Sequence, residues 1–460
     1  MAMGKRKARQ ESLFVATDRL LQSQGHPFYQ KLNALLDEAK FDGWIEGRCA
    51  PYYEQEEKSG RPSIVPGIYF RMLLVGYFEG IDSQRGIAWR CADSLSLRAF
   101  LGIPLDEGTP DHSTLTNTRK RLPAEIFEEM FQFVLGIAEA KELIAGKTVG
   151  IDSTTLEANA AMKSIVRRDT GEDWKQFVTR LMREEGAIGA EEQPSDEEIR
   201  RFDKKRKNKT VSNVEWKSPS DEDARIARMK DGTTHLAYKA EHVVDLESEI
   251  VLAAEIRLAD QADTATLVDS VLTAQINLEK AGSEMVIEEV AADKGYHAAE
   301  TIENCDFMDI RTYIPEPKRA EEAKLADRPE EQQRAMRNNR RRVKRAKSKA
   351  LQRRRSEVVE RTFAHICETG GSRRSHLRGL INVTKRYLIT VAAHNLGRIL
   401  RRLTGVGKPR VLQGLAGVVP AVLLLAAVLK SVYSRSEKSP TNNIDRIRPF
   451  KNYNTNALLT

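Results

Sequence analysis

The sequence predicts an α/β protein in which an all-helical N-terminal part precedes a mixed domain of strands and helices. Two apolar runs, 147–152 and 286–293, each end in an acid, which is typical of buried strands that present a carboxylate at their ends. Residues 10–140 show the apolar spacing of successive helices instead. These two patterns place the helical part first and the sheet second.

Length, charge and cysteine spacing limit the class of protein. A chain of 460 residues exceeds what one core usually covers, so two or three domains are expected. Charged residues make up 30% of the chain and the net charge is +8, which favours a polyanionic partner, with nucleic acid as the leading candidate. Four cysteines without CxxC spacing argue against a zinc finger and a disulfide framework, and for a reducing, cytoplasmic compartment.

The N-terminal part, 1–140, is predicted to be a helical DNA-binding domain. Residues 63–78 form an apolar helix with Pro66 in its first turn, and 83–91 and 95–101 give two short successors. Residues 109–123 then offer a capped helix with basic residues at its far end. Short helices with a basic final one suggest a relative of the helix-turn-helix, and the alternative is a bundle whose basic face is only solvated.

Residues 141–402 follow the element order of a ribonuclease H-like domain with one long insertion. The first strand ends at Asp152, and a charge-dense insertion covers about 160–231, with a capped helix at 195–198 and a basic run at 204–209. That run either touches DNA or is solvated in a mobile loop. A hairpin at 233–258, a helix at 263–281, the Asp293 strand, a helix at 297–304, a strand at 310–314 and a final helix complete the order. In this layout the first and fourth strands are neighbours.

A third acid comes from the final helix. Val359, Phe363 and Ile366 make its apolar stripe, and Glu360 lies at the edge of that stripe. Glu357, one turn away, is a competing candidate. Two Asp and one Glu that converge in this way would hold two hard divalent cations.

The motifs of this chain resemble those of DDE transposases of bacterial insertion sequences. The resemblance covers about residues 30–402 and is closest to the branch whose second acid sits in an Asp-Lys-Gly-Tyr motif, here Asp293 to Tyr296. Its remaining motifs are Gly60-Arg-Pro62, Gly76-Tyr-Phe-Glu-Gly80, Pro110-Asp-His-Ser-Thr-Leu115, Ser356-Glu-Val-Val-Glu360-Arg-Thr-Phe363, Arg378-Gly-Leu380, Asn382-Val383 and Ala393-His-Asn-Leu396.

The resemblance implies that Asp152, Asp293 and Glu360 are the catalytic and metal-binding triad of a transposase. Such an enzyme nicks the ends of its own element and joins them to target DNA. Mg²⁺ or Mn²⁺ would be the cofactor, because hard cations suit carboxylate ligands and relieve the repulsion among three acids. One cation would activate a water or a 3′-hydroxyl, and the other would stabilise the leaving oxygen.

Two alternatives stay open: a ribonuclease H-like nuclease that only hydrolyses, and a DNA-binding descendant of a transposase without catalysis. The intact Asp152, Asp293 and Glu360 argue against the second, and one departure from the resemblance keeps it open. Many relatives carry Tyr and Arg in the two turns before the Glu and Lys two turns after it, whereas this chain has Arg353, Ser356 and Cys367. All these positions are expected on one helical face with Glu360.

A basic track is predicted to bind double-stranded DNA, both the terminal inverted repeats and the target. Its densest part is 334–355, which leads into the Glu360 helix and would release many counterions on binding phosphates. The predicted DNA-binding residues are Lys294, Arg340, Arg341, Arg342, Lys344, Arg345, Arg353, Arg354, Arg355, Arg361, Arg373, Arg374, Arg378, Lys385 and Arg386.

The remaining expectations concern the tail and the assembly. Residues 403–460 are predicted to form an apolar and then disordered tail, and the apolar run 411–429 is interrupted by Gln413, Gly414, Gly417 and Pro420, so a membrane span is not expected. Met1 to Gln10 lacks the apolar region of a secretory signal. A homodimer is expected because two transposon ends must meet, and the protein is expected in the bacterial cytoplasm, associated with the nucleoid.

Overall fold

The computed structural model describes residues 25–53, 63–144, 146–207, 211–229, 232–317 and 327–410. The Met1 to Gln10 stretch, the Gly60 to Pro62 motif and the apolar run 411–429 lie outside these residues. Residues up to Pro409 belong to one compact unit. Within the described residues, no helix has the length and apolar character needed to cross a bilayer.

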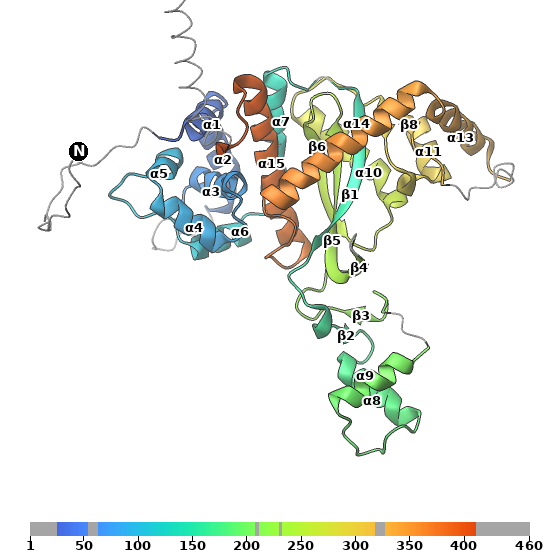
Figure 1. The fold of residues 1–460 in the computed structure, drawn as a ribbon. Coiled ribbons are helices and arrows are strands. Elements are labelled where there is room, and N and C mark those ends of the chain that lie inside the picture. The colour runs from blue at the N-terminus through green and yellow to red at the C-terminus, as the bar shows by residue number, and fades with distance from the viewer. Residues whose placement is uncertain are drawn as a thin grey trace, which may run out of the picture. The chain divides into compact units, whose positions relative to one another are not determined.

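The described N-terminal part is helical, as predicted (Figure 1). Pro66 begins the helix that was predicted from it, where its missing N–H costs no hydrogen bond. Asp111 caps the basic helix by accepting a hydrogen bond from the Ser113 N–H at 2.9 Å. The helices are α1 (Pro27–Glu38), α2 (Phe41–Cys49), α3 (Pro66–Glu79), α4 (Gln84–Asp93), α5 (Leu95–Leu101), α6 (His112–Arg121) and α7 (Ala124–Ala140).

A six-stranded sheet forms the centre of the rest of the unit. Its path is β4-β5-β1-β7-β8, and β6 also pairs with β5. The pairs β1 with β5 and β5 with β6 are antiparallel, whereas β7 runs parallel to β1 and β8 parallel to β7. The strands are β1 (Thr148–Glu157), β4 (Arg225–Arg228), β5 (Thr234–Asp245), β6 (Val251–Leu258), β7 (Glu289–Ala291) and β8 (Arg311–Tyr313).

The predicted hairpin and the predicted neighbours in the sheet are confirmed. β5 and β6 turn at Leu246 to Ile250, where Glu249 has a positive φ of 64°. Gly150 of β1 pairs with Ala291 of β7, so the first strand and the Asp293 strand lie side by side. The order of strands is consistent with a ribonuclease H-like fold.

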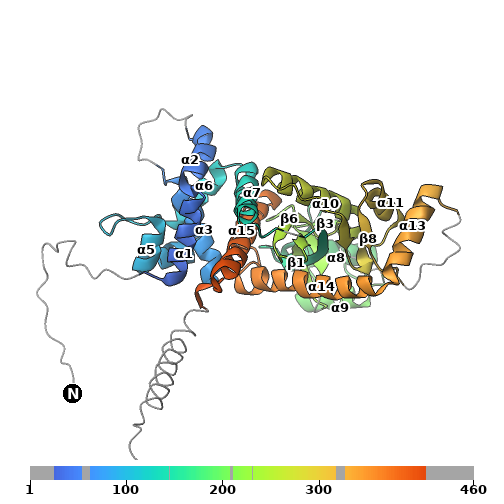
Figure 2. The same cartoon turned by 90° about the horizontal axis from the view of Figure 1, so that it is seen from above.

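Helices cover both faces of the sheet. Figures 1 and 2 show α14 (Ala346–Phe363) crossing one face, while α10 (Asp263–Lys280) and α11 (Ala299–Phe307) lie on the other. The long helix α15 (Leu380–Thr404) packs against β6 and also against α3 and α7. It therefore joins the N-terminal helices to the sheet.

The basic segment 334–355 was predicted to run without a break into the Glu360 helix, and this prediction is wrong. The segment is divided between α13 (Glu330–Val343) and α14, with a break at Lys344 and Arg345. Beyond Phe363 the helix continues as a π-helical segment, Ala364–Thr369. A π-helix has more residues per turn than an α-helix, so the residues within this segment leave the face that α-helical spacing predicts for them. Cys367 is therefore buried, at 1% exposure, while Arg353 and Glu360 are exposed, which corrects the expectation of one shared face.

The described part of the insertion is a small folded subdomain, which corrects the interpretation as a mobile loop for the start of the basic run, where Lys204 and Lys205 belong to α9 (Asp196–Lys205). Asn208 and Lys209 of the run lie outside the described residues. Strands β2 (Val166–Arg167) and β3 (Trp216–Lys217) pair at its base, and α8 (Trp174–Glu184) and α9 lie beyond them (Figure 1). Val178, Met182 and Ile199 form its core. The predicted cap at Ser195 is a capping box with Glu198.

The four cysteines are buried and free, so the expectation of no disulfide framework holds for all of them. Burial raises the pKa of Cys49, Cys91 and Cys305 to about 12. Their thiols therefore stay protonated and unreactive at neutral pH.

Gly150 provides a test of the packing between β1 and α14. An added Cβ would lie 2.7 Å from Leu246 Cδ2 and 3.0 Å from Arg355 Cγ. We expect Gly150→Ala to lower the free energy of unfolding by about 1–3 kcal/mol through overpacking. Urea unfolding measures this loss, with Gly108→Ala as the matched control because that position faces open space. Equal stability of the two variants would contradict the packing.

Candidate active site and nucleic-acid interface

Asp152 lies on the face of β1 that α14 covers. Its Oδ2 accepts a hydrogen bond from Arg355 Nη1 at 2.7 Å, and its Oδ1 accepts one from the Ser153 N–H at 2.8 Å. Burial raises the pKa of Asp152, and the neighbouring charge of Asp293 raises it further, whereas Arg355 acts in the opposite direction. Asp152 is thus a buried acid whose charge depends on a cationic partner.

Asp293 lies two residues after the end of β7 and close enough to Asp152 for the two charges to interact. Its Oδ1 accepts a hydrogen bond from the Gly295 N–H at 2.7 Å. A Cβ at Gly295 would lie 3.0 Å from that oxygen and 3.2 Å from Asp263 Oδ2, so glycine permits the close turn. The structure therefore brings the first two predicted acids together.

Glu360 is exposed on α14 and does not complete a ligand set in this structure. It accepts a hydrogen bond from Ser356 Oγ at 2.8 Å. Its competitor Glu357 pairs with Arg361 and lies 3.7 Å from Arg354. Throughout the described ranges, no three His, Cys, Asp or Glu side chains lie close enough together to hold a metal ion.

Arg355 was predicted as part of the DNA-binding track, and its role beside Asp152 was not predicted. The signal that could have found this role is its spacing from Val359 and Phe363, four and eight residues further on. Residues at i, i+4 and i+8 lie on one helical face, and that face packs on the sheet. Arg355 is 8% exposed and Val359 is fully buried, in agreement with that spacing.

The other face of the sheet carries a polar network that the sequence analysis did not find. Glu241 of β5 is buried and accepts hydrogen bonds from Tyr296 Oη and Thr266 Oγ1, both at 2.8 Å. Ser153 Oγ donates to Asp263 Oδ1 at 3.0 Å, and Lys239 forms an ion pair with the same carboxylate. Burial raises the pKa of Glu241. The tyrosine of the Asp-Lys-Gly-Tyr motif thus anchors the Asp293 turn to the sheet.

His242 joins α14 and α15 to the sheet beside Asp152, with which it pairs across the strands. Thr362 Oγ1 already donates to the Val359 carbonyl oxygen, so it accepts from His242 Nδ1 at 2.9 Å. His242 Nε2 then carries no proton and accepts from Tyr387 Oη at 2.8 Å. Burial lowers the pKa of His242 to about 3, so the ring is neutral.

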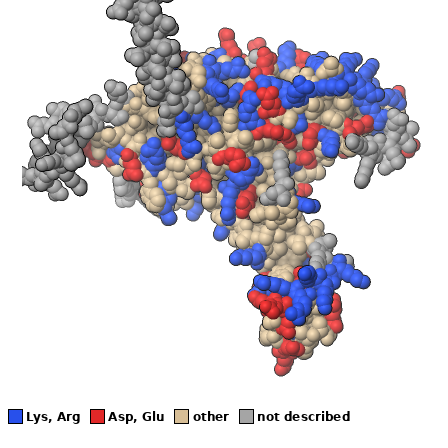
Figure 3. All heavy atoms as spheres, viewed as in Figure 1, with Lys and Arg blue, Asp and Glu red and all other residues tan. Residues whose placement is uncertain are grey.

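The predicted basic track divides into residues that are exposed and residues that are buried or partly buried. Lys and Arg gather over α13 and α14 in Figure 3. Lys385 does not belong to this surface, because it is buried and donates to the Leu122 carbonyl oxygen at 2.7 Å. The exposed predicted residues are Lys294, Arg341, Lys344, Arg345, Arg353, Arg374 and Arg378.

The other predicted cations are at least partly buried and have partners within the protein. Arg340 pairs with Glu316, and Arg342 donates to the Thr312 carbonyl oxygen. Arg373 pairs with Glu368. The remaining three partly buried cations are Arg354 and Arg361, which pair with Glu249, and Arg386, which donates to the Ile81 carbonyl oxygen.

Two family models match the chain. A transposase domain, DUF772, matches residues 16–121, and a transposase DDE domain matches residues 193–396. The chain is a DDE transposase. It is an enzyme that acts on DNA in transposition, and DDE transposases use divalent metal ions. The comparison with curated proteins gave no match.

The two matches cover the predicted acids of the transposase unequally. Asp293 and Glu360 lie within the DDE match, whereas Asp152 lies between the two matched ranges. The assignment of Asp152 therefore depends on the sheet, where β1 pairs with β7 and places it beside Asp293.

The burial of His242 in its neutral form makes the stability of the transposase depend on pH. The folded state keeps the ring neutral, whereas the unfolded chain takes up a proton below its ordinary pKa of about 6.5. Stability is therefore complete above pH 6.5 and falls as the pH is lowered, by up to about 1.4 kcal/mol per pH unit for each such histidine. Burial lowers the pKa of His365 to about 4 and that of His394 in the same direction.

We expect His242→Gln to reduce the slope of the free energy of unfolding against pH between pH 6.5 and 5. The reduction should equal the contribution from the uptake of one proton, because glutamine cannot titrate. Urea unfolding at several pH values measures the slope. Above pH 7 the two proteins should show parallel curves, which serves as the internal control. An unchanged slope in the variant would mean that His242 is not held neutral.

Proposed function

We propose that the transposase cleaves DNA strands at the ends of its own insertion sequence and joins them to target DNA, with Asp152, Asp293 and Glu360 as the catalytic acids. The observation that carries this proposal is the parallel pairing of β1 with β7, which reaches Gly150 and Ala291, two residues before Asp152 and Asp293. The prediction that the first strand ends at Asp152 is wrong, because pairing with β5 continues β1 to Glu157. Glu360 comes from α14, the helix that packs on β1. The DDE match supports the last two acids, and the Asp-Lys-Gly-Tyr motif supports the proposed branch of the family.

The donor set fits a hard divalent cation. Asp152 and Asp293 supply carboxylate oxygens whose charges repel each other, and Arg355 is the cation that now offsets the charge of Asp152. Bound Mg²⁺ or Mn²⁺ would supply activation of the attacking oxygen and stabilisation of the leaving oxygen. The protein's own contribution is to hold Asp152 between Arg355 and the Ser153 N–H, and Asp293 against the Gly295 N–H.

Within this proposal the helical part, 1–140, binds DNA and residues 141–402 form the catalytic part. The exposed cations of α13 and α14 lead the DNA toward the acids, because α14 carries both Arg353 and Glu360. Two element ends must meet in one reaction, which favours a homodimer on DNA. The insertion, with Lys204 and Lys205 in α9, is a further candidate for DNA contact.

The central test is cleavage and joining of labelled DNA that carries the flanking ends of the gene, with Mg²⁺ or Mn²⁺. We expect Asp152→Asn, Asp293→Asn and Glu360→Gln each to lower both reactions by at least about a thousandfold, since each loses a charged ligand worth several kcal/mol in the transition state. DNA binding, measured by gel shift, should survive in all three variants.

Glu357→Gln is the matched control, because this acid lies one turn from Glu360 on the same helix. It should keep cleavage and joining near the wild-type rate. Activity that persists in Glu360→Gln but disappears in Glu357→Gln would assign the third acid to Glu357. A wild-type protein that cuts but never joins would be a nuclease, and one that binds the ends without cutting would have lost catalysis.

The exposed cations give a separate prediction about DNA binding. We expect Lys344→Glu with Arg345→Glu to weaken binding about tenfold and to reduce the slope of log affinity against log salt by about 2, one for each lost phosphate contact. Titrations of labelled duplex at several salt concentrations measure both quantities. Lys280→Glu, an exposed cation at the end of α10, is the control. Equal salt slopes for the two proteins would place the DNA elsewhere.

A further inference from the structure

A cavity of about 220 Å³ lies where the N-terminal helices meet the sheet domain. Its wall includes α3, α6 and α7 on one side, and the far end of β1, residues 371–377 and α15 on the other. A single water accounts for about 30 Å³ of liquid, so the cavity has room for a polyatomic ligand. None of the proposed catalytic acids lines it.

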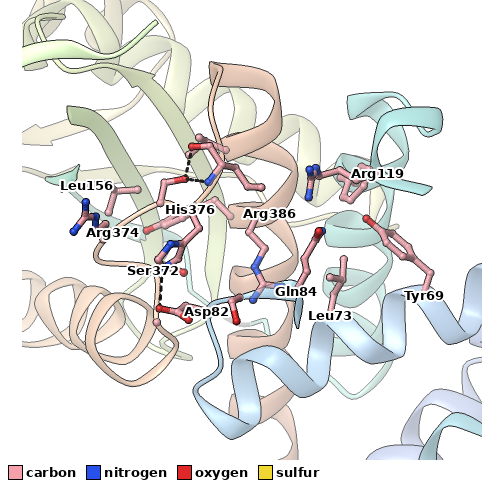
Figure 4. A pocket seen from close by; sticks show the side chains of 17 residues that line it. Tyr69, Leu73, Asp82, Gln84, Arg119, Leu156, Ser372, Arg374, His376 and Arg386 are labelled. Atoms are coloured by element: carbon pink, nitrogen blue, oxygen red, sulfur yellow. Dashed lines mark hydrogen bonds and ion pairs between the residues drawn. The ribbon is translucent and has the colours of Figure 1, made fainter. Parts of the chain in front are cut away.

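Three polar groups in this cavity have donor atoms without partners. Tyr69 is fully buried and its hydroxyl has no hydrogen-bond partner. Arg119 is 8% exposed, and its Nε and Nη1 atoms also have none. The buried Nη1 of Arg386 is likewise unpaired, although its Nη2 donates to the Ile81 carbonyl oxygen at 3.2 Å. Figure 4 shows Arg386 between Arg119 and Tyr69 on one side and Arg374 on the other.

These groups lie near enough to act on one another. The charges of Arg119 and Arg386 both affect Tyr69, and the charge of Arg119 affects Arg386. Lys385 adds a third cation, because its Nζ donates to the Arg119 carbonyl oxygen at 3.3 Å. Burial lowers the pKa of both arginines. Two buried guanidinium groups that repel each other are costly unless an anion pairs with them.

The protein itself provides few negatively charged side chains to pair with these arginines. Among the described lining residues, Asp82 is the acid, and its charge offsets part of the charge of Arg386. Its Oδ2 also interacts with His376 Nε2 at 2.9 Å. Burial holds the phenol of Tyr69 protonated, so it offers a hydrogen and not a negative charge. The cavity therefore has an excess of positive charge and several unused donors.

The remaining wall is apolar. Leu73, Phe127, Leu156 and Val383 face the same space. Arginine forks match the geometry of phosphate and carboxylate groups, and apolar walls favour an organic group attached to the anion. A bare inorganic ion would use the arginines and leave the apolar wall without contacts.

We propose that this cavity binds a small organic phosphate, a phosphate monoester such as a nucleoside monophosphate, between Arg119, Arg386 and the Tyr69 hydroxyl. The ligand is a free small molecule and not a phosphate of duplex DNA, because groups as buried as Tyr69 and Arg119 lie beyond the reach of a duplex backbone. Its occupancy stabilises the contact between the helical part and the sheet, since a ligand of the folded state favours folding. The site is independent of the proposed strand transfer.

Calorimetric titration of the full chain with deoxyadenosine monophosphate tests the proposal, at constant ionic strength and with deoxyadenosine as the ligand control. Wild-type protein should bind the nucleotide and gain thermal stability, while deoxyadenosine should do neither. Tyr69→Phe should bind about tenfold more weakly, the value of one hydrogen bond to a charged group. Arg119→Met should bind at least about a hundredfold more weakly.

Two controls keep the outcomes distinct. Tyr69→Phe removes a hydroxyl that has no partner, so it should fold as the wild type does and remain informative if Arg119→Met does not fold. Lys120→Met, an exposed cation next to Arg119 on α6, should bind the nucleotide like the wild type. Absence of binding to the wild type would overturn the proposal, and so would equal binding by wild type and Tyr69→Phe.

A competition experiment with duplex DNA distinguishes a free phosphate ligand from a phosphate of DNA. Saturating duplex DNA should leave nucleotide binding unchanged. Displacement of the nucleotide by duplex would mean that the cavity takes a DNA phosphate and would overturn the assignment of a free ligand. None of these measurements needs cleavage or joining, so a failed strand-transfer assay leaves this test unaffected.

Discussion

The packing of α14 on β1 is the contact on which the candidate site depends. It brings a helix within van der Waals distance of a strand at Gly150, where any side chain would collide with Leu246 and Arg355. The same approach lets Arg355 reach Asp152. A gap of even one methylene between helix and strand would separate this ion pair and leave a buried carboxylate without its cationic partner.

Around this contact, the two faces of the sheet have different chemistry. The α14 face carries Asp152 and the neutral His242, which hydrogen bonds to Thr362 and Tyr387. The α10 face carries Glu241 and its hydroxyl donors. Because successive residues of a strand point to opposite faces, a one-residue slip in β1 would exchange Asp152 for Ser153. The nine-residue pairing of β1 with β5 holds that register.

Helix α15 connects the sheet to the N-terminal helices. Asn395 donates to the Val251 carbonyl oxygen at 2.8 Å and accepts from the Val251 N–H at 3.0 Å, which fixes the helix to β6. Nearer the start of α15, Lys385 lies at the end of α6 and Arg386 lies against α3. The cations that a linear sequence groups with a DNA-binding track are thus used inside the protein, at the contact between its helical and mixed parts.

The sequence by itself determined the elements of this protein and most of their order. The hairpin at β5 and β6 and the helices α3 and α10 follow from local apolar spacing, caps and turns, which act over a few residues. The same patterns placed Asp152 at the end of its strand, whereas pairing with β5 continues β1 to Glu157. The adjacency of Asp152 and Asp293 also followed, once the strand order was inferred. The joint order of the motifs identified the family before any contact was known.

Only the tertiary structure decided which charged groups are free. Arg355, Lys385 and Arg386 look like their exposed neighbours in a basic stretch, yet burial gives each a different partner. The π-helical segment after Phe363 buries Cys367, and no spacing rule announces that change of register. The cavity at Arg119 joins residues more than 200 positions apart. Contacts over such separations are set by how helices pack on the sheet, and a local pattern carries no information about that packing.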